Sequence, residues 1–463
     1  MSTTDPGAPT VAPAFTEVGI AARIERLPRA PWQVRARMVI GVATFFDAFD
    51  ALSVAYVLPV LAVLWGLQPH QIALAISIGF FGQLVGALSV GPVAERWGRI
   101  PVAALSVLIF SLGSLALAFS PNFVFFLVVR FIQGIGLGAE VPVAATYIAE
   151  ITGAHRRGRF VLLYELVFPA GLLVAAVAGF WIVPTLGWQW MFILGALPAL
   201  IALYLRRKMP ESPRWLQRAG RDEEADRVLA GLEEMTRRET GKELPPPATV
   251  DALQVSQRAT WRDLFGGIYL RRTLVVWVLW FSAYLTTYGL TSWLPTIYRT
   301  VYKLSLNDSL LYSLVTTGSG LLGAVIYAFT VDIVGRRVAL AGGLLIGGVL
   351  LLVLTGLGAG SAPEVLLWSS LAYLWISAVS LTAYLYTPEL YPTRVRALGV
   401  GVASAWLRIA SILGPFVVSA VISGTGQITI VFLIFGSVAL AGGLIVALFG
   451  VETRNKVLEE FSP

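Results

Sequence analysis

The sequence contains no cysteine and only two histidines, His70 and His155. Without cysteine there can be no disulfide framework, no thiolate metal site and no cysteine nucleophile. Two histidines are too few for a multi-histidine metal centre. Charge is also scarce, because 13% of the 463 residues are Asp, Glu, Lys or Arg, against about 25% in soluble domains. These absences exclude an ordinary soluble domain, and we expect neither a metal nor another cofactor.

Apolar residues are correspondingly abundant. They make up 57% of the chain, and the mean hydropathy is +0.76. Twelve apolar stretches, in two groups of six, are long enough to cross about 30 Å of hydrocarbon at about 1.5 Å per residue. We therefore predict an all-α membrane protein with twelve transmembrane helices in two pseudo-symmetric six-helix bundles. The predicted divisions are an N-terminal segment (1–37), the first bundle (38–205), a linker (206–272), the second bundle (273–450) and a tail (451–463).

Two details of this prediction concern the sixth span and the linker. The sixth span is predicted as one stretch over 188–205. In the linker, EEADRVLAGLEEMTRRE reads as an amphipathic helix, and the prolines at 245–247 are expected to break it.

The basic residues predict the orientation. A net charge of +7 in a soluble protein would suggest an acidic partner such as nucleic acid. Here thirty of the 34 Lys and Arg residues fall on one side of the predicted spans, which marks that side as cytoplasmic. The N-terminus also lacks the pattern of a secretory signal peptide. We expect a multi-pass protein of the cell inner (plasma) membrane with both termini cytoplasmic, in contact with the lipid bilayer and not with nucleic acid.

The two halves of the chain repeat each other. GPVAERWGRI (91–100) matches AFTVDIVGRR (328–337), and PESPRW (210–215) matches VETRNK (451–456). Glu150 and Glu389 match at a similar offset. Ordered matches at nearly one spacing indicate duplication, and parallel six-span repeats are a transporter architecture.

These segments resemble the signature loops of the major facilitator superfamily over essentially all of 40–460. The motifs that resemble its sugar-porter-like branch are RFIQGIGLGAEVPVAATYIAE (130–150), PESPRWL (210–216), YTPELYPTRVRALG (386–399) and VETRNKVLEE (451–460). FFDAFDALSVAYVLPVL (45–61) and SAWLRIASILGP (404–415) are more similar to metabolite:proton symporters. That group includes aromatic-acid and nicotinate-type carriers and is related to synaptic-vesicle and organic-anion transporters. The resemblance implies two bundles that work by alternating access.

Departures from the sugar-porter pattern disfavour a sugar substrate. The paired glutamines of the seventh span are missing from FSAYLTTYGLTSWLP (281–295), Tyr384 stands where those porters have Trp, and Glu165 stands where they have a sugar-binding Gln. In the first loop motif, Glu95 replaces Asp and Ile100 replaces Arg.

Six charged residues lie inside predicted spans, where each costs about 2.5–3.5 kcal/mol and is by default functional. They are Asp47, Asp50, Arg130, Glu140, Glu165 and Arg408. Four acids and two bases cannot all pair as ions, so some of the acids must be hydrated or protonated. Asp47 and Asp50 lie one helical turn apart, where like charges oppose simultaneous ionisation.

The resemblance pairs Asp50 with Arg130, and we hypothesise that Asp50 takes a coupled proton while Arg130 tunes its affinity. The alternative is a static ion pair that holds two spans together. Glu140 follows Arg130 by ten residues on a different face, so it carries either a second proton or a structural hydrogen-bond network. We predict Asp47, Asp50, Arg130 and Glu140 as proton-coupling residues.

Arg408 is predicted to anchor the anionic group of the substrate, because Arg binds carboxylates through two parallel hydrogen bonds. The alternative is that Arg408 pairs with Asp47 or Glu165 across the bundles. In the seventh span, Tyr284 and Tyr288 lie mid-span and are better cavity candidates than the tryptophans near its ends. The predicted substrate-binding set is Arg408, Glu165, Tyr284, Tyr288, Tyr384, Phe46, Phe49, Gln133 and Tyr373.

The loop motifs are predicted to latch one conformation without touching substrate. The candidate latch residues are Gly91, Glu95, Arg96, Gly98, Arg99, Glu150, Arg156, Asp332, Arg336, Glu389 and Arg394. The run GIGLG (134–138) lacks the rest of a dinucleotide-binding fingerprint, and its small residues predict close helix packing.

These patterns predict a monomeric secondary transporter that imports a small organic anion, an aromatic or heteroaromatic carboxylate, together with H⁺. A sugar or polyol:H⁺ symporter and an efflux antiporter for drugs or organic ions remain alternatives. A transport-silent receptor with the same fold is another. A membrane enzyme finds no support, because the sequence offers no nucleophile–base pair or metal cluster.

Overall fold

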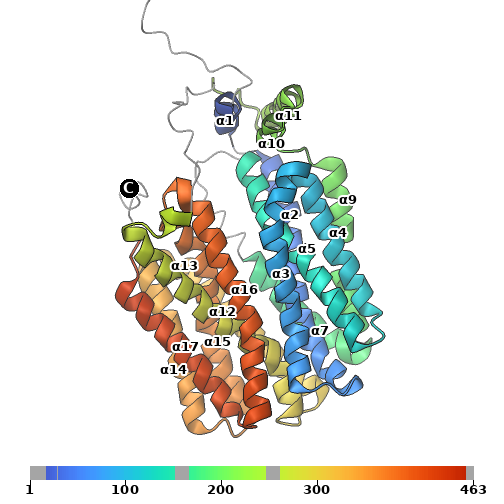
Figure 1. Cartoon of the computed structure of the whole chain (residues 1–463), viewed down its shortest axis with the longest axis vertical. Coiled ribbons are helices and arrows are strands. Elements are labelled where there is room, and N and C mark those ends of the chain that lie inside the picture. Colours follow the sequence, from blue (N-terminus) through green and yellow to red (C-terminus); the bar gives the residue numbers. More distant parts are fainter. Residues whose placement is uncertain (1–16, 29, 152–165, 247–260, 455–463) are drawn as a thin grey trace, which may run out of the picture.

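The computed structural model describes residues 17–28, 30–151, 166–246 and 261–454. In this part of the chain, twelve helical segments are long and apolar enough to cross a membrane. They form two bundles that stand side by side (Figure 1), which confirms the predicted fold. The N-terminal bundle comprises α2 (Pro31–Leu64), α3 (Pro69–Trp97), α4 (Arg99–Ala118), α5 (Phe123–Ile151), α7 (Val167–Thr185), α8 (Gln189–Gly195) and α9 (Ala199–Lys208). The C-terminal bundle comprises α12 (Ile268–Thr300), α13 (Leu306–Val334), α14 (Arg336–Leu357), α15 (Ala362–Glu389), α16 (Thr393–Gly424) and α17 (Ile428–Phe449).

The sixth span, predicted over 188–205, is one candidate span over Gln189–Lys208. It consists of α8 and α9, separated by a turn that contains Pro198. Proline lacks the N–H that would continue the hydrogen-bond ladder of a helix, so the helix is interrupted there.

The helix predicted in the linker forms as α11 (Asp222–Thr240), but the prolines at 245–247 do not end it. Gly241 does, because it adopts a left-handed conformation with φ of 64° and its N–H bonds to Arg237 O. This is the usual way in which glycine closes a helix.

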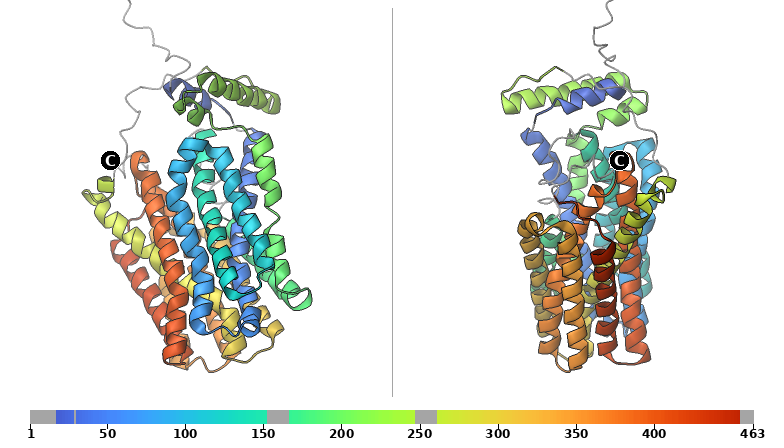
Figure 2. Two further views of the ribbon diagram at one scale, coloured as in Figure 1. Left: turned by 45° about the vertical axis from the view of Figure 1, so that its right-hand side comes forward. Right: turned by 90° about the vertical axis from the view of Figure 1, so that its left-hand side faces the viewer.

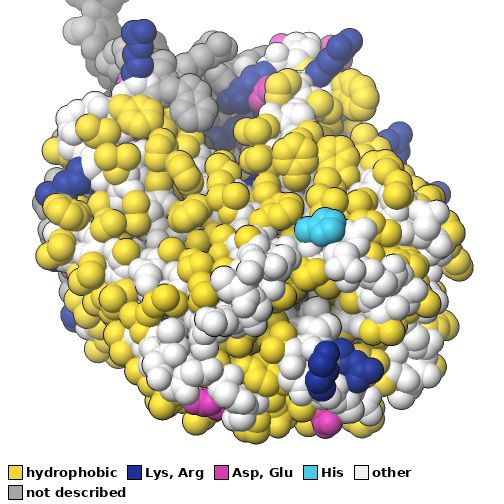
Figure 3. Space-filling model, turned by 60° about the horizontal axis from the view of Figure 1, so that its bottom comes forward, with side chains coloured by type: hydrophobic (Ala, Val, Ile, Leu, Met, Phe, Trp, Pro, Cys, Tyr) yellow, Lys and Arg dark blue, Asp and Glu magenta, His cyan; other side chains and the backbone are white. Residues whose placement is uncertain are grey.

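Three short helices gather at one end of the N-terminal bundle, which we call the linker end. They are α1 (Glu17–Glu25), α10 (Pro213–Arg218) and α11, and Figures 1 and 2 show them above the bundle. Ile20 and Ile24 of α1 are buried against Trp215, Leu216 and Leu229. We call this three-helix unit the platform. The opposite end, the far end, carries few charged side chains among its apolar ones (Figure 3).

Glycines let α5 pack very closely against α3. A Cβ on Gly134 would lie 2.2 Å from Gly79 O, and one on Gly138 would lie 2.0 Å from Gln83 O. Only glycine fits at these two crossings. The contact fixes how α5 is rotated, and with it the direction in which Arg130, Gln133 and Glu140 point.

The bundles meet along three helix pairs, α2 with α12, α3 with α16 and α7 with α13. Ser77 Oγ of α3 donates to Ile412 O of α16 at 2.8 Å. Phe80 and Tyr288 bring α3 and α12 together, with ring centroids 4.8 Å apart. The candidate site lies along this interface.

Candidate functional site

Asp50, Arg130 and Gln133 form a buried triad in the N-terminal bundle. Arg130 Nη1 forms a salt bridge with Asp50 Oδ2 and donates to Gln133 Oε1 at 2.6 Å, and Gln133 Nε2 donates to Asp50 Oδ1 at 2.7 Å. All three side chains are buried, with exposures of 3% or less. The structure thus brings Asp50 and Arg130 together, as the family resemblance implies. Gln133 belongs with this pair, although it was predicted among the substrate-binding residues.

Arg408 on α16 is a buried guanidinium that has no carboxylate partner among the described residues. Its hydrogen bond runs to Ser404 O of its own helix at 3.1 Å, and its Nε has no partner. Asp47 on α2 lies across the bundle interface, and the charges of the two residues attract each other. They form no salt bridge, and Asp47 Oδ1 is buried without a hydrogen-bond partner. The two charges therefore interact across the bundle interface without forming a salt bridge.

Aromatic rings line the interface beside these charges. Trp280, Tyr284 and Tyr288 stack in sequence along α12, with centroid distances of 5.5 and 6.1 Å and interplanar angles of 30° and 19°. Phe80 of α3 contacts Tyr288 from the other bundle, with the two rings tilted at 59°. Tyr384 packs edge-on against Trp280 at 4.6 Å. We call these five rings the aromatic ladder.

The ladder lies close to both unbridged charges. Tyr288 interacts electrostatically with Asp47 and Arg408, as well as with Tyr373 and Tyr384. Tyr284 donates its hydroxyl hydrogen bond to Ser380 O at 3.2 Å. The predicted residues Asp47, Arg408, Tyr284, Tyr288, Tyr373 and Tyr384 therefore gather in one region.

Other predicted residues lie elsewhere or outside the described ranges. Phe46 and Phe49 pack against each other on α2, with centroids 6.0 Å apart. The structure brings Phe46 into the hydrophobic contacts around Ala43, Val107 and Leu205. Glu165 and Arg156 lie outside the described residues, as does the side chain of Arg394.

The first loop motif ties three helices of the N-terminal bundle together. Arg99 is 2% exposed and donates to Glu95 at 2.8 Å and to Glu150 at 3.0 and 3.2 Å. Glu211, which follows α9, accepts from the backbone N–H groups of Arg99 and Ile100 at the start of α4. Burial raises the pKa of Glu211, although these backbone hydrogen bonds act against the shift. Anions are favoured at helix N-termini.

The second loop motif repeats this arrangement in the C-terminal bundle. Arg336 pairs with Asp332 at 2.7 Å and with Glu389 at 3.5 Å. Glu452 accepts from the backbone N–H groups of Arg336 and Arg337 at the start of α14. Glu452 therefore does for α14 what Glu211 does for α4.

Both turns require glycine. Gly98 has φ of 100° and Gly335 has φ of 101°, values that side chains with a Cβ rarely adopt. A Cβ on Gly98 would lie 2.4 Å from Glu211 Oε2, and one on Gly335 would lie 2.6 Å from Glu452 Oε2. Among the described residues, no salt bridge of either motif joins one bundle to the other, and Gly91 and Arg96 are exposed beside the first motif. A latch between the bundles therefore stays a prediction.

Sequence reasoning missed four residues that contribute to these sites. Trp280 is not among the predicted cavity residues, yet its position four residues before Tyr284 places it on the same stripe of α12. Phe80 carried no signal, because only tertiary packing determines which side chain of α3 meets Tyr288. The repeat pairs Glu211 with Glu452 in the sequence. Only the folded structure shows that each caps the start of a helix.

Known proteins resemble this chain over nearly its whole length. The family profile described as "Sugar (and other) transporter" matches residues 41–463. The niacin transporter NiaP of Acinetobacter baylyi is 34% identical over 440 residues, covering 95% of this chain and 99% of that protein. A synaptic vesicle 2-related protein of Xenopus laevis is 28% identical over 461 residues, covering 95% and 82%.

Among solved structures, the proton:xylose symporter XylE bound to a bromodeoxyglucose matches with a TM-score of 0.68 at 21% identity. The match covers 93% of this chain and 98% of that one, and at this identity it shows the fold. The twelve spans, the profile match and the full-length relatives agree. The chain belongs to the sugar (and other) transporter family of the major facilitator superfamily, and it is a multi-pass membrane transporter, not an enzyme.

Proposed function

We propose that this protein is a secondary active transporter that takes up a small organic anion together with one or more protons by alternating access. The proposed substrate is an aromatic or heteroaromatic carboxylate, with nicotinate as the first candidate. The proposed location is the cell inner (plasma) membrane, with the linker end in the cytoplasm. Because one chain supplies both bundles of the site, we propose that it works as a monomer.

The observation that carries the substrate class is the buried guanidinium of Arg408, which has no carboxylate partner among the described residues. A buried charge without a partner costs free energy. Such a charge is therefore retained in evolution chiefly where a bound ligand supplies the opposite charge. A carboxylate would accept two parallel hydrogen bonds from Arg408. The aromatic ladder beside it offers rings against which a flat substrate ring can stack. The name of the niacin transporter, which is similar over its full length, agrees with a ring that carries a carboxylate.

The proposed site of proton coupling is the triad together with the neighbouring Asp47, whose charge interacts with those of Asp50 and Arg130. Protonation of Asp50 would remove its negative charge, break the ion pair and leave Arg130 held by Gln133 alone. An arrangement with two states of this kind can bias the two bundle orientations of alternating access. The structural alternative is a permanent ion pair that joins α2 to α5.

The proposed orientation rests on charge. Thirty of the 34 Lys and Arg residues belong to the linker side of the spans, and positive residues accumulate on the cytoplasmic side. Arg299 and Lys303 are the exceptions near the far end.

The experiment is uptake of radiolabelled nicotinate by proteoliposomes with an inward proton gradient. Benzoate, nicotinamide, an aliphatic carboxylate, xylose and an organic cation serve as competitors. Nicotinate and benzoate should compete, because both carry a ring and a carboxylate, whereas nicotinamide and xylose should not. Competition by xylose or the cation, without competition by carboxylates, contradicts the proposed substrate class.

Arg408 variants test the anchor. Arg408→Lys keeps the charge but loses the paired hydrogen bonds, and Arg408→Ala loses both. One charge-assisted hydrogen bond contributes about 1.5–3 kcal/mol, so KM should rise about tenfold or more in both variants. Arg238→Ala is the control, because Arg238 is exposed on α11 and pairs only with its neighbour Glu234. An unchanged KM in a folded Arg408→Ala protein would refute the anchor.

A further inference from the structure

One buried charged residue of the N-terminal bundle lies outside the triad, the bundle interface and the first loop motif. Glu140 on α5 is 3% exposed, and its Oε2 is enclosed with no hydrogen-bond partner among the described residues. It lies 200° around the helix from Gly138, which packs on α3, so its side chain points away from α3. It faces a small pocket within the bundle.

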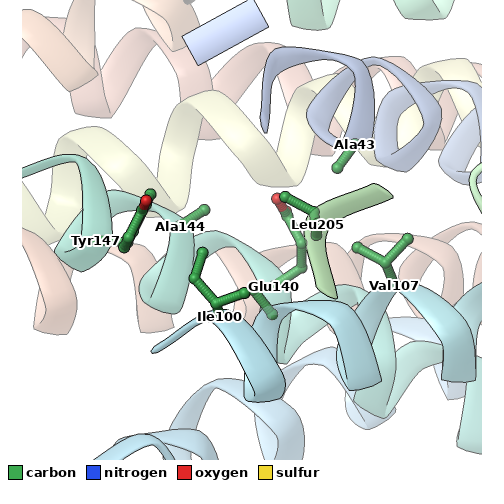
Figure 4. Close-up of a pocket in the computed structure, with 8 residues that line it drawn as sticks. Ala43, Ile100, Val107, Glu140, Ala144, Tyr147 and Leu205 are labelled. Atoms are coloured by element: carbon green, nitrogen blue, oxygen red, sulfur yellow. The ribbon is translucent and has the colours of Figure 1, made fainter. Parts of the chain in front are cut away.

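The pocket lies between four helices and is apolar apart from two residues of α5 (Figure 4). Its lining residues are Ala43 of α2, Ile100, Ala103 and Val107 of α4, Glu140, Ala144 and Tyr147 of α5, and Leu205 of α9. About 10 Å³ is open to the centre of a water molecule, which is near the least that one water needs. The pocket is therefore too small for a substrate and suited to one water molecule or none.

Its position connects the bundle interface with the linker end. Ala43 lies one helical turn from Asp47, so the two residues share a face of α2, and the charges of Asp47 and Glu140 interact. Glu140, Ala144 and Tyr147 follow one stripe of α5 toward the linker end. There the Tyr147 hydroxyl donates to Pro210 O at 2.8 Å, in the segment that joins α9 to the platform.

The neighbouring charges leave Glu140 without a cationic partner in the described structure. On α2, Asp47 is itself acidic and Asp50 is paired with Arg130. Arg35 is paired with Glu239, and Arg37 forms no salt bridge with Glu140. On α4 it is Arg99, which is engaged with Glu95 and Glu150. On α9, Arg206 follows Leu205 and is exposed. A carboxylate without a counter-ion is costly in apolar surroundings, whereas a protonated carboxyl is neutral.

We propose that Glu140 and its pocket form a second intramembrane proton-binding site, through which the coupled proton passes between Asp47 and the linker end. This inference rests on the proposed function, which supplies the proton coupling. In the transfer, the carboxyl of Asp47 loses its proton to a water molecule, which donates one of its own protons to Glu140 Oε2 at the same time; the two carboxyls are not hydrogen-bonded to each other. Glu140 then releases the proton to water at the linker end. The proton would thus leave through the N-terminal bundle, while the substrate leaves between the bundles.

The test compares three activities of proteoliposomes that contain Glu140→Gln. Glutamine keeps the shape of the side chain but cannot carry the proton. Exchange of labelled for unlabelled nicotinate without a gradient requires substrate binding and alternating access but no net proton release. We expect exchange to stay within twofold of wild type. Uphill accumulation and nicotinate-driven proton flux should each fall at least tenfold.

A pocket variant tests the route without touching the carboxyl. Ala144→Val adds two methyl groups to the lining and should slow proton flux and accumulation several-fold while exchange persists. Ala145→Val makes the same change at the next, exposed position of α5 and should resemble wild type. If Glu140→Gln fails to fold, the comparison of Ala144→Val with Ala145→Val still tests the proton route.

The outcomes separate the two proposals. If wild type takes up nicotinate with no proton flux, the proposed coupling is wrong and this inference falls with it. If wild type is coupled and Glu140→Gln keeps its proton-to-substrate ratio and accumulation, only the role of Glu140 is overturned. Loss of exchange in a folded Glu140→Gln protein would also overturn it, because Glu140 would then support the fold of the bundle and not the proton.

Discussion

Glu233 of α11 should hold the platform together, and Glu233→Gln is the sharpest test of that role. Arg23 of α1 donates two parallel hydrogen bonds to Glu233, at 2.9 and 3.1 Å, and Arg26 donates a third at 2.7 Å. The Glu233 side chain is 7% exposed, and the arginines are 16% and 15% exposed. Such shielded, charge-assisted hydrogen bonds are stronger than surface ion pairs.

The magnitude follows from what the substitution leaves behind. The amide oxygen of the introduced glutamine could still accept one hydrogen bond, and Arg23 would keep Asp226 at 2.5 Å. The loss of stability in Glu233→Gln is therefore smaller than the full cost of breaking a buried ion pair, which is about 3–5 kcal/mol. We expect about 2–3 kcal/mol, in the range of one to two charge-assisted hydrogen bonds. At about 1.36 kcal/mol per factor of ten, opening of α1 from the platform should become about 30- to 150-fold more frequent.

Hydrogen–deuterium exchange of peptides from α1 and α11 at pH 7 measures this opening. Glu234→Gln is a matched control, because Glu234 is half exposed and pairs only with Arg237 and Arg238 on its own helix. Glu233→Gln should speed exchange of α1 by the stated factor, and Glu234→Gln should change it little. Equal protection in the two variants would refute the reasoning.

Glu233 should also make the stability of the platform depend on pH. Burial acts to raise the pKa of Glu233, but the hydrogen bonds and charges of Arg23 and Arg26 outweigh it, so the pKa lies below its ordinary value. A lowered pKa contributes stability that is complete above the ordinary pKa of about 4.3 and is lost as the pH falls through the lowered value. Wild type should therefore lose α1 protection in acid below about pH 4, and Glu233→Gln should not show this component.

Three further predictions concern the membrane part. Asp50→Asn leaves Arg130 buried without a counter-ion and should destabilise the fold by about 3–5 kcal/mol, seen as a lower melting temperature, while uphill uptake is lost. Gly98→Ala should destabilise the protein more than Gly220→Ala. Both glycines have positive φ, but only a Cβ at Gly98 would meet another residue, Glu211. Equal melting temperatures of the two variants would contradict the role of Glu211 as a helix cap. Trp280→Leu removes two ring contacts, about 0.5–1.5 kcal/mol each, and should lower the preference for nicotinate over an aliphatic carboxylate about tenfold in competition assays.

Much of the fold could be predicted because hydrophobic length is a direct signal. Spans of about twenty apolar residues are required by the thickness of the bilayer, and the two groups of six followed from counting them. Local breaks were harder to predict. Pro198 lies inside an apolar stretch and interrupts the sixth span, while Gly241 ends α11 before the chain reaches the prolines that were expected to break it.

The candidate site was predictable as a set of residues but not as an arrangement. Arg408 and Asp47 were visible because charges are rare in spans. That they interact without a salt bridge depends on how α2 and α16 are rotated. The close contacts of Gly171 with Phe45 of α2 and of Gly414 with Gly289 of α12 determine this rotation. The Arg23 and Arg26 contacts with Glu233 join positions about 210 residues apart, for which no local pattern exists.

The division of charges between the bundles suggests how the proposed coupling would operate. Asp47, Asp50, Arg130 and Glu140 belong to the N-terminal bundle, whereas Arg408 belongs to the C-terminal one. The field of Arg408 acts on Asp47 across the interface. A carboxylate bound to Arg408 would cancel part of that field. The anionic form of Asp47 would then be less stabilised, and Asp47 would retain a proton more readily. Substrate and proton would thus favour each other's binding through Asp47 without touching the same atoms, and by linkage the effect must be reciprocal. Nicotinate affinity should therefore rise as the pH falls in wild type, and this dependence should weaken in Asp47→Asn while Arg408 still binds the anion.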